Sequence, residues 1–205
     1  MSPLAPSLIA FTLAAALLTV TPGLDTALVL RTAAAEGARR AFAASLGICL
    51  GCLAWGALVA VGLGMLLQAS ELAYLALKWV GACYLLYLGV RLILARRAEA
   101  EGSEPAPRAS WFLRGLLTNL LNPKVGAFYV SFLPQFIPAG ASVPSTTLLL
   151  AAIHAALGLL WFALLIGATR PLARALRNPA LVRGLDRATG IVLIFFGLKL
   201  AFSRQ

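Results

Sequence analysis

Two charged side chains stand inside apolar stretches of this 205-residue chain, and each lies close to a proline. Asp25 comes three residues after Pro22, and Lys124 directly follows Pro123. A buried carboxylate or ammonium group can bind an ion of opposite charge, and a carboxylate can also carry a proton. Each charge costs roughly 2.5–3.5 kcal/mol at the centre of a membrane helix, which favours a functional site. A structural Asp25–Lys124 ion pair that only joins two segments is the alternative.

The two prolines predict interruptions in the helices that carry these charges. A proline inside a helix costs about 3 kcal/mol or more, but it fits the first position of a new helix after a Thr or Asn cap. Thr21-Pro22 and Asn122-Pro123 both match this pattern of a helix restart. At about 1.5 Å per residue, the breaks lie roughly 21 Å and 18 Å into their segments, near the middle of a bilayer. Two helix starts would meet there and attract a carboxylate.

The composition indicates that these segments lie in a membrane. Hydrophobic residues make up 61% of the chain and charged residues 12%, and the mean hydropathy is +0.91. A spanning helix needs roughly 20 apolar residues. Six apolar segments fit this requirement or approach it: Leu8–Leu30, Phe42–Leu67, Leu72–Leu94, Trp111–Phe136, Thr146–Thr169 and Thr189–Phe202. Their continuous apolar character differs from the alternation of a transmembrane barrel, so we predict an all-α membrane protein with six transmembrane helices.

The distribution of positive charge predicts the topology. The formal net charge is +10, and thirteen of the 17 Lys and Arg residues lie in the stretches 31–40, 91–114 and 170–187. These stretches are alternate connections between the predicted helices. By the positive-inside rule they are cytoplasmic, and both termini lie outside. The charge therefore indicates membrane orientation and no nucleic-acid partner.

A charged, proline-containing stretch, residues 96–110, divides the chain into the halves 1–95 and 111–205. Each half holds three predicted helices. The halves echo each other in two pairs of stretches: Leu18–Asp25 with Thr118–Val125, and Tyr87–Leu92 with Phe195–Leu200. Two homologous halves with an odd number of helices enter the membrane in opposite senses. We therefore predict a cytoplasmic linker between two transmembrane repeats, in a 3+3 inverted repeat with a broken first helix in each half; chance similarity of apolar helices is the alternative.

Further polar residues lie near the breaks or inside other segments. Asn119 and Asn122 are one turn apart, and Asn122 could bind a ligand or serve only as a helix cap. Gln135 follows Pro134 at the end of its segment, which suits either a gate or an interfacial turn. His154 is the only histidine. It could be packed and hydrogen-bonded, or it could relay protons to Asp25.

Small residues in the second segment are expected to serve packing. Cys49 and Cys52 have no second cysteine pair or histidine beside them in the sequence, so we expect no metal site and no cofactor. Small residues recur every four positions at Ala43, Gly47 and Gly51. Such a stripe lets helices approach closely, either within the bundle or between two copies in a homodimer.

Four stretches together carry a family resemblance: TPGLD at 21–25, Gly47–Gly64, Leu77–Leu92 and Gly115–Phe136. They resemble the LysE/RhtB family of bacterial amino-acid exporters, and in particular its threonine and homoserine branch. The last stretch, with NPK and LPQF, is the most specific. Leu24 departs from the family pattern T-P-G-P-D, which has a second proline there, but the carboxylate is kept.

The resemblance implies a multi-pass protein of the bacterial inner membrane that exports amino acids or close derivatives in exchange for protons. Family members act on threonine, homoserine and its lactone, leucine or basic amino acids, so the substrate stays open. Asp25 is the candidate proton carrier, and Lys124 would balance it or hold a substrate carboxylate. The expected pathway comprises Thr21, Pro22, Gly23, Asp25, Asn119, Asn122, Pro123, Lys124 and Gln135, with His154 as a candidate relay.

Two other classes of function are disfavoured by the sequence. The motifs H-E-x-x-H and G-x-S-x-G do not occur, so we expect no enzyme. An exporter of metal ions or other small solutes from the same superfamily is the alternative to amino-acid export. It would require more acidic or histidine ligands inside the membrane than the predicted segments supply.

Overall fold

The residues that the structure describes form helices joined by short connections. The computed structural model describes residues 4–69, 71–94, 110–168 and 178–202. The elements are α1 (Leu4–Val20), α2 (Leu24–Glu36), α3 (Ala38–Ala69), α4 (Glu71–Leu94), α5 (Trp111–Leu120), α6 (Pro123–Ala127), the π-helical turn η1 (Phe128–Phe132), the 3-10 turn η2 (Leu133–Phe136), α7 (Val143–Gly167) and α9 (Pro179–Phe202). No strand occurs in these ranges. The predicted all-α class is confirmed.

The first predicted helix is interrupted near Pro22, as expected. α1 ends at Val20, α2 begins at Leu24, and the two helices are bent by 51°. The new helix begins two residues later than predicted, with Gly23 in extended conformation at its cap. Thr21 is therefore not the cap of α2, and its hydroxyl instead donates to Leu17 O at the end of α1, at 2.7 Å. The break exists although Leu24 stands in place of the family's second proline.

The second break follows the predicted cap closely. Asn122 Oδ1 accepts a hydrogen bond from the backbone N–H of Lys124 at 3.1 Å, and Pro123 occupies the first position of α6. After this short helix the backbone widens into the π-helical turn η1 and then tightens into the 3-10 turn η2. Single π-helical turns are typical of functional sites, because they shift the side chains that follow. The local sequence thus determines where α5 ends and α6 begins.

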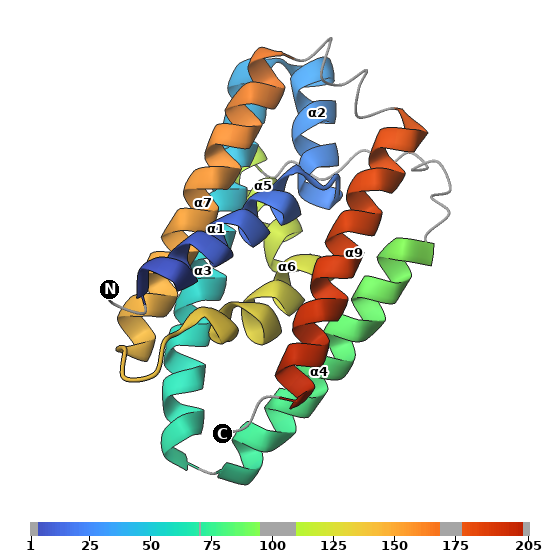
Figure 1. Cartoon of the computed structure of the whole chain (residues 1–205). Helices are drawn as coiled ribbons and strands as arrows, with labels where there is room; N and C mark the ends of the chain where they lie inside the picture. Colours follow the sequence, from blue (N-terminus) through green and yellow to red (C-terminus); the bar gives the residue numbers. More distant parts are fainter. Residues whose placement is uncertain (1–3, 70, 95–109, 169–177, 203–205) are drawn as a thin grey trace.

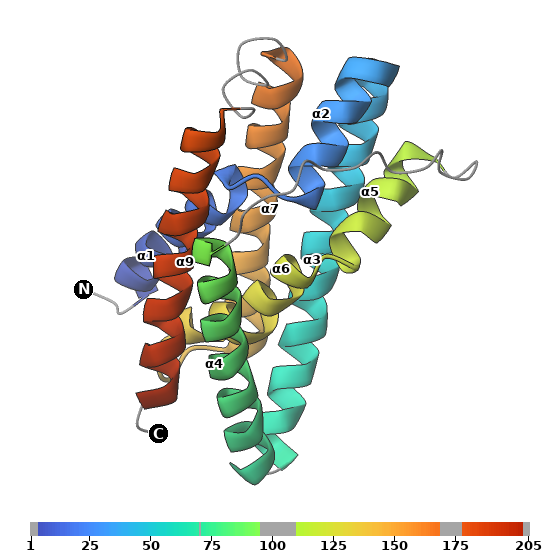
Figure 2. The ribbon, with the colours of Figure 1, turned by 90° about the vertical axis from the view of Figure 1, so that its right-hand side faces the viewer.

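Close backbone contacts hold the long helices together. α3 packs against α5 and α7, and α4 packs along α9; Figures 1 and 2 show α4 and α9 side by side in both views. A Cβ on Gly47 of α3 would lie 2.0 Å from Phe112 O, and one on Gly115 of α5 would lie 2.0 Å from Ala44 O. Only glycine permits this approach, so the predicted small-residue stripe serves packing within the bundle at Gly47.

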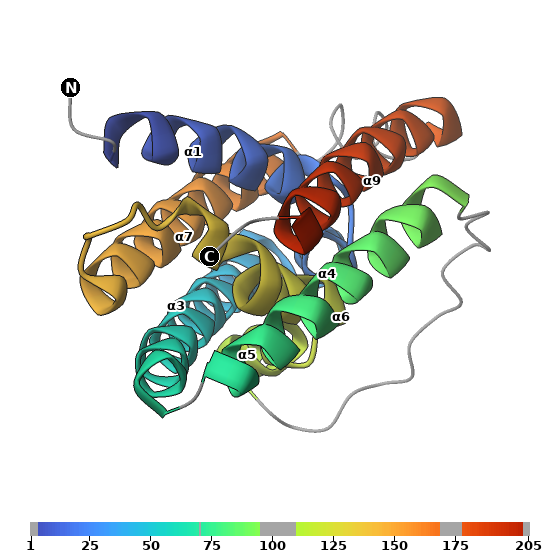
Figure 3. The same cartoon turned by 60° about the horizontal axis from the view of Figure 1, so that its bottom comes forward.

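The short helix α6 lies in the middle of the bundle, between α3 and α4, as Figures 1 and 2 show, and Figure 3 gives the view turned about the horizontal axis. α6 contacts α4 and continues directly into η1, which contacts α4 as well. A short helix that ends inside a bundle is tolerated at membrane depth only where protein buries its ends or where it borders a cavity. The break before α6 is therefore the place to look for a site.

The described helices include clear candidates for membrane spans. The stretches Ala38–Gly62 and Val143–Gly167 are long and apolar enough to cross a bilayer, and the bent pair α1–α2 passes the same test as one span. Large apolar side chains are exposed on most of the described helices, for example at Leu13, Leu58, Leu160 and Ile191. Such side chains suit contact with lipid tails.

The last helix is longer than the sequence indicates. α9 begins at Pro179, ten residues before the predicted start at Thr189. The apolar pattern placed the start too late because Arg183, Asp186 and Arg187 belong to the helix and lower its mean hydropathy. The linker predicted at 96–110 lies outside the described residues except for Ser110. The hydroxyl of Ser110 accepts from Leu113 N at 3.3 Å and caps α5.

Candidate functional site

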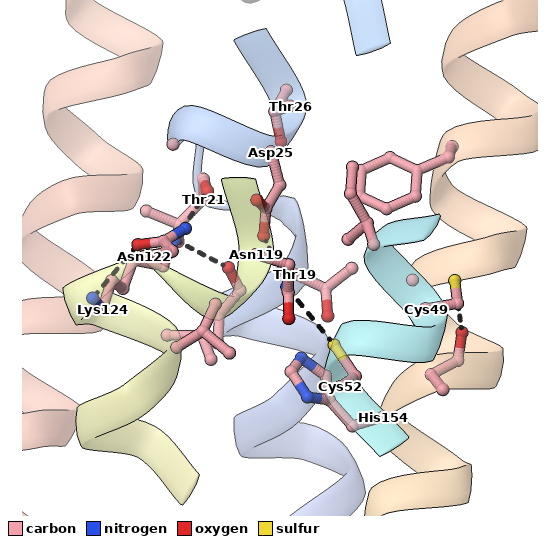
Figure 4. A pocket seen from close by; sticks show the side chains of 17 residues that line it. Thr19, Thr21, Asp25, Thr26, Cys49, Cys52, Asn119, Asn122, Lys124 and His154 are labelled. Carbon is pink, nitrogen blue, oxygen red and sulfur yellow. Dashed lines mark hydrogen bonds between the residues drawn. The ribbon is translucent and has the colours of Figure 1, made fainter. Parts of the chain in front are cut away.

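The two helix breaks meet at one pocket, whose other walls come from α3 and α7 (Figure 4). Seven of the residues predicted for the site line it: Thr21, Gly23, Asp25, Asn119, Asn122, Lys124 and His154. The prolines of the breaks shape the backbone beside it. Gln135 lies elsewhere, in η2, where its amide nitrogen donates to Ser131 O at 3.0 Å. The structure thus brings together predicted residues that are about one hundred positions apart in the sequence.

Asp25 lies in the first turn of α2 and points at Asn119 (Figure 4). Its Oδ2 accepts a hydrogen bond from Asn119 Nδ2 at 3.0 Å. Its other oxygen, Oδ1, is buried and has no hydrogen-bond partner among the described residues. The position at a helix N-terminus stabilises a carboxylate, and the open oxygen leaves it able to accept a further donor.

Asn119 connects three helices at the centre of the site. Its side chain is fully buried, and besides Asp25 of α2 it contacts Cys52 of α3, with Nδ2 3.6 Å from the sulfur. A Cβ on Gly51 would lie 2.5 Å from Asn119 Oδ1, so the second glycine of the α3 stripe makes room for this amide. Asn119 Oδ1 is also buried without a hydrogen-bond partner in the described part of the chain. Two residues that line the pocket thus each have a buried acceptor oxygen without a hydrogen-bond partner among the described residues.

Lys124 binds the end of α1. Its Nζ donates to Leu18 O at 3.1 Å and to Thr21 O at 2.9 Å. An ammonium group at this position satisfies carbonyls that a helix end leaves open, and it also interacts favourably with the helix dipole. Lys124 thus joins α6 to the first break. The sequence left a structural ion pair with Asp25 as the alternative to a functional site; both residues line the pocket, and the choice between the two stays a prediction.

The last helix reaches the first break through a pair of threonines. The hydroxyl of Thr21 is hydrogen-bonded to the hydroxyl of Thr189 on α9. One turn earlier on α9, Asp186 is buried with 3% of its surface exposed. Burial of Asp186 was not expected, because this residue precedes the predicted start of the helix and stands among arginines, which suggested a loop.

His154 is buried in α7, and its partner is Tyr129. His154 Nδ1 and Tyr129 Oη lie 3.0 Å apart, and the imidazole also packs against the ring of Phe128 with centroids 5.0 Å apart. The packed, hydrogen-bonded arrangement is thus present, and the ring still borders the pocket beside Cys52 (Figure 4). Tyr129 was missed. A tyrosine in the apolar stretch AFYVSF carries a hydroxyl that needs a partner, and this is the signal that could have identified it.

The thiols of α3 form part of the pocket wall. Cys49 and Cys52 are unpaired by disulfides, and Cys49 Sγ donates weakly to Ala155 O at 3.4 Å. Among the described residues no group of three or more His, Cys, Asp and Glu side chains is placed to hold a metal ion. The polar chemistry of this pocket is that of one carboxylate, one ammonium group, amides and hydroxyls.

Comparison with known proteins decides the family. The model of the LysE type translocator family matches residues 16–204. The chain belongs to this family. The translocator is 30% identical to the membrane protein YrhP of Bacillus subtilis, with 96% of this chain and 99% of that protein covered. No solved structure matches it.

Two further relatives of this LysE type translocator are named for what they export. It is 31% identical to the leucine efflux protein of Klebsiella pneumoniae, with 64% of each chain covered. It is 29% identical to the homoserine/homoserine lactone efflux protein of Salmonella typhimurium, with 96% of each chain covered. These relatives are membrane transporters, so the translocator is a membrane protein too, which is consistent with the bacterial inner membrane.

Proposed function

We propose that this LysE type translocator exports amino acids or close derivatives from the cytoplasm in exchange for protons, through the pocket between its two helix breaks. The observation that carries the proposal is the meeting of Asp25, Asn119 and Lys124 at these breaks. A charged pocket at broken helices is typical of the substrate site of secondary transporters. The names of the leucine and homoserine efflux relatives support the class of substrate.

The helix contacts support the inverted repeat that alternating access would use. Suppose that α1–α2, α3 and α4 of the first half correspond to α5–η2, α7 and α9 of the second. The contact between α3 and α5 should then have a counterpart between α7 and α1, and the structure contains both contacts. The contacts between α3 and α7 and between α4 and α9 each join two corresponding helices, so exchanging the halves leaves these contacts unchanged. The pair α4–α9 is reciprocal even in detail, because a Cβ on Gly89 would lie 2.7 Å from Gly190 O and one on Gly190 would lie 2.6 Å from Gly89 O. The proposed transport cycle rocks one half against the other around the pocket.

An aromatic cluster would form the outer gate. Phe128, Phe132 and Phe136 follow the second break and pack with Phe11 of α1 and Phe196 of α9. The cluster adjoins the pocket through the contact between Phe128 and His154. Along the chain it lies between α6 and the connection before α7, which the positive-inside rule assigns to the outer side. Opening would require the two broken helices to separate at these rings.

Asp25 is the proposed carrier of the coupling proton. As a carboxylate it accepts from Asn119 and keeps Oδ1 for a second donor, and as a neutral acid it would release a cationic partner. Alternate binding of a proton and of a substrate ammonium group at one carboxylate gives exchange without a second acidic site. A metal-ion exporter is the weaker alternative. Asp25, His154 and two thiols line the pocket, but among the described residues no three such side chains lie close enough together to hold a metal ion.

Inside-out membrane vesicles that contain the protein test this function directly. The vesicle interior corresponds to the outside of the cell, so an acidic interior should drive uptake of labelled amino acids. Vesicles without the protein are the control, and labelled divalent cations are offered in parallel. Uptake of no amino acid under the gradient, or uptake of divalent cations alone, would contradict the proposal.

A further inference from the structure

A glycine of α7, Gly158, lines one side of the pocket. His154, Gly158 and Phe162 recur every four residues on α7 and all line the pocket. A Cβ on Gly158 would meet Phe162 Cε2 at 3.8 Å and Cys49 Sγ at 3.9 Å, which are ordinary van der Waals distances. Gly158 is thus not required by helix packing, unlike Gly47 or Gly190. It leaves a notch between α3 and α7 that a methyl group would fit.

The surroundings of this notch are apolar. Ile48 and Phe162 line the pocket and belong to a hydrophobic cluster with Val29 and Leu165. Ala155 adds a further apolar wall on α7. The charged side chains and the amides come from the two helix breaks, whereas α3 and α7 add the thiols of Cys49 and Cys52 and the imidazole of His154. The pocket therefore has a polar end at the breaks and an apolar end between α3 and α7.

The unsatisfied atoms at the polar end indicate the group that binds there. Asp25 Oδ1 and Asn119 Oδ1 are buried acceptors without a hydrogen-bond partner among the described residues. Leaving a buried acceptor unsatisfied costs about 1–3 kcal/mol, so both oxygens suit a ligand that donates several hydrogen bonds. An ammonium group, with three donors and a positive charge, matches them.

The balance of charge restricts the rest of the ligand. Asp25 is the acidic residue and Lys124 the basic residue that line the pocket in the described part of the chain. A zwitterion adds no net charge to such a site. A cationic or anionic side chain would have to lie against Ile48, Phe162 and Ala155, where an unpaired charge is strongly disfavoured.

We propose that the pocket takes a neutral α-amino acid with an aliphatic side chain, and that Gly158 sets the length of the side chain it accepts. The ammonium group binds the oxygens Asp25 Oδ1 and Asn119 Oδ1, and a methyl group of the aliphatic side chain enters the notch between Cys49 and Phe162. This inference rests on the proposed function and specifies its substrate class. Leucine and valine are the probes of fitting shape, alanine is the short probe and lysine is the charged one.

The test is uptake of these four amino acids by inside-out vesicles with Gly158→Ala and Gly158→Val. One methylene group in an apolar pocket changes discrimination by about 10-fold to 200-fold, so Gly158→Ala should lower the ratio of leucine to alanine uptake by at least about tenfold. Gly158→Val should lower it further. Gly62→Ala is the matched control, because Gly62 is an exposed helical glycine with open space at its Cβ, and it should leave the ratio unchanged.

A binding measurement on purified protein covers the case in which a variant is poorly produced. Leucine should raise the melting temperature of the wild type, and lysine should not, while leucine should lose this effect in Gly158→Val. Uptake of amino acids with an unchanged leucine-to-alanine ratio in both variants, or a preference for lysine, would overturn the assignment of Gly158 and leave export standing. Failure of the wild type to take up any amino acid would overturn the proposed function itself.

Discussion

Removing the hydroxyl of Tyr129 tests whether His154 is a structural residue or a proton relay. Tyr129→Phe keeps the ring, which lies 5.6 Å from the imidazole between centroids, and deletes the hydrogen bond of 3.0 Å to Nδ1. Tyr129 is fully buried and His154 almost so. The imidazole nitrogen is then left without this partner in a place that water reaches poorly.

The expected effect is a loss of stability. An unsatisfied buried polar group costs about 1–3 kcal/mol. For a chain of this size each kcal/mol lowers the melting temperature by about 2–4 °C, so the melting temperature should fall by about 2–12 °C. Replacing both partners, in Tyr129→Phe with His154→Leu, should recover part of the loss, because neither polar group then remains.

Thermal unfolding of detergent-solubilised protein measures this, and Tyr84→Phe is the matched control. The Tyr84 hydroxyl donates a long hydrogen bond of 3.4 Å to Pro123 O, so its removal should cost little. Gradient-driven transport by surviving Tyr129→Phe protein should be kept. Equal melting temperatures for the two tyrosine variants would refute the structural role, and normal stability with abolished transport would favour the relay.

Three further predictions concern topology, the second break and helix packing. In a cysteine-free background, a membrane-impermeant thiol reagent added to intact cells should label Ala139→Cys but not Ala38→Cys, since the connection at 31–40 is expected to be cytoplasmic; equal labelling would disprove the orientation. Pro123→Ala should reach the membrane at near-normal levels but lose most transport, because α5 could continue through the break; normal export per molecule would reject the broken-helix site. Gly190→Ala should destabilise the protein by about 1–3 kcal/mol through overpacking against the backbone of α4, whereas Gly184→Ala on the same helix has open space and should not; equal melting temperatures would contradict the close α4–α9 approach.

Both helix breaks could be predicted because their causes are local. Pro22 and Pro123 cannot continue a helix, and Asn122 has a side chain that caps the next one. These effects depend on neighbouring residues only. The start of α2 at Leu24 was missed by two residues because Thr21, the expected cap, bonds backwards to Leu17 O instead.

The partners of the charged residues could not be predicted, because they depend on how distant segments pack. From the sequence, Asp25 and Lys124 could form a functional pair or only a structural ion pair, since opposite charges in a membrane attract. The sequence carries no sign that the carbonyls at the end of α1 are within reach of Lys124, or that Asn119 faces Asp25. The notch beside Gly158 could not be predicted either, because its size depends on the side chains that pack around it.

Uptake by inside-out vesicles that contain Asp25→Asn is the most direct test of proton-coupled export. Asparagine keeps the shape of the side chain but cannot carry a proton, so an imposed pH gradient should no longer drive accumulation of amino acid. Exchange of labelled for unlabelled substrate, which needs no net proton movement, should partly survive. Lys124→Gln and the double variant, each normalised to protein in the membrane, serve as controls for a purely structural role. Gradient-driven accumulation that persists in Asp25→Asn, or that returns in the double variant, would contradict the role of Asp25 as the proton carrier.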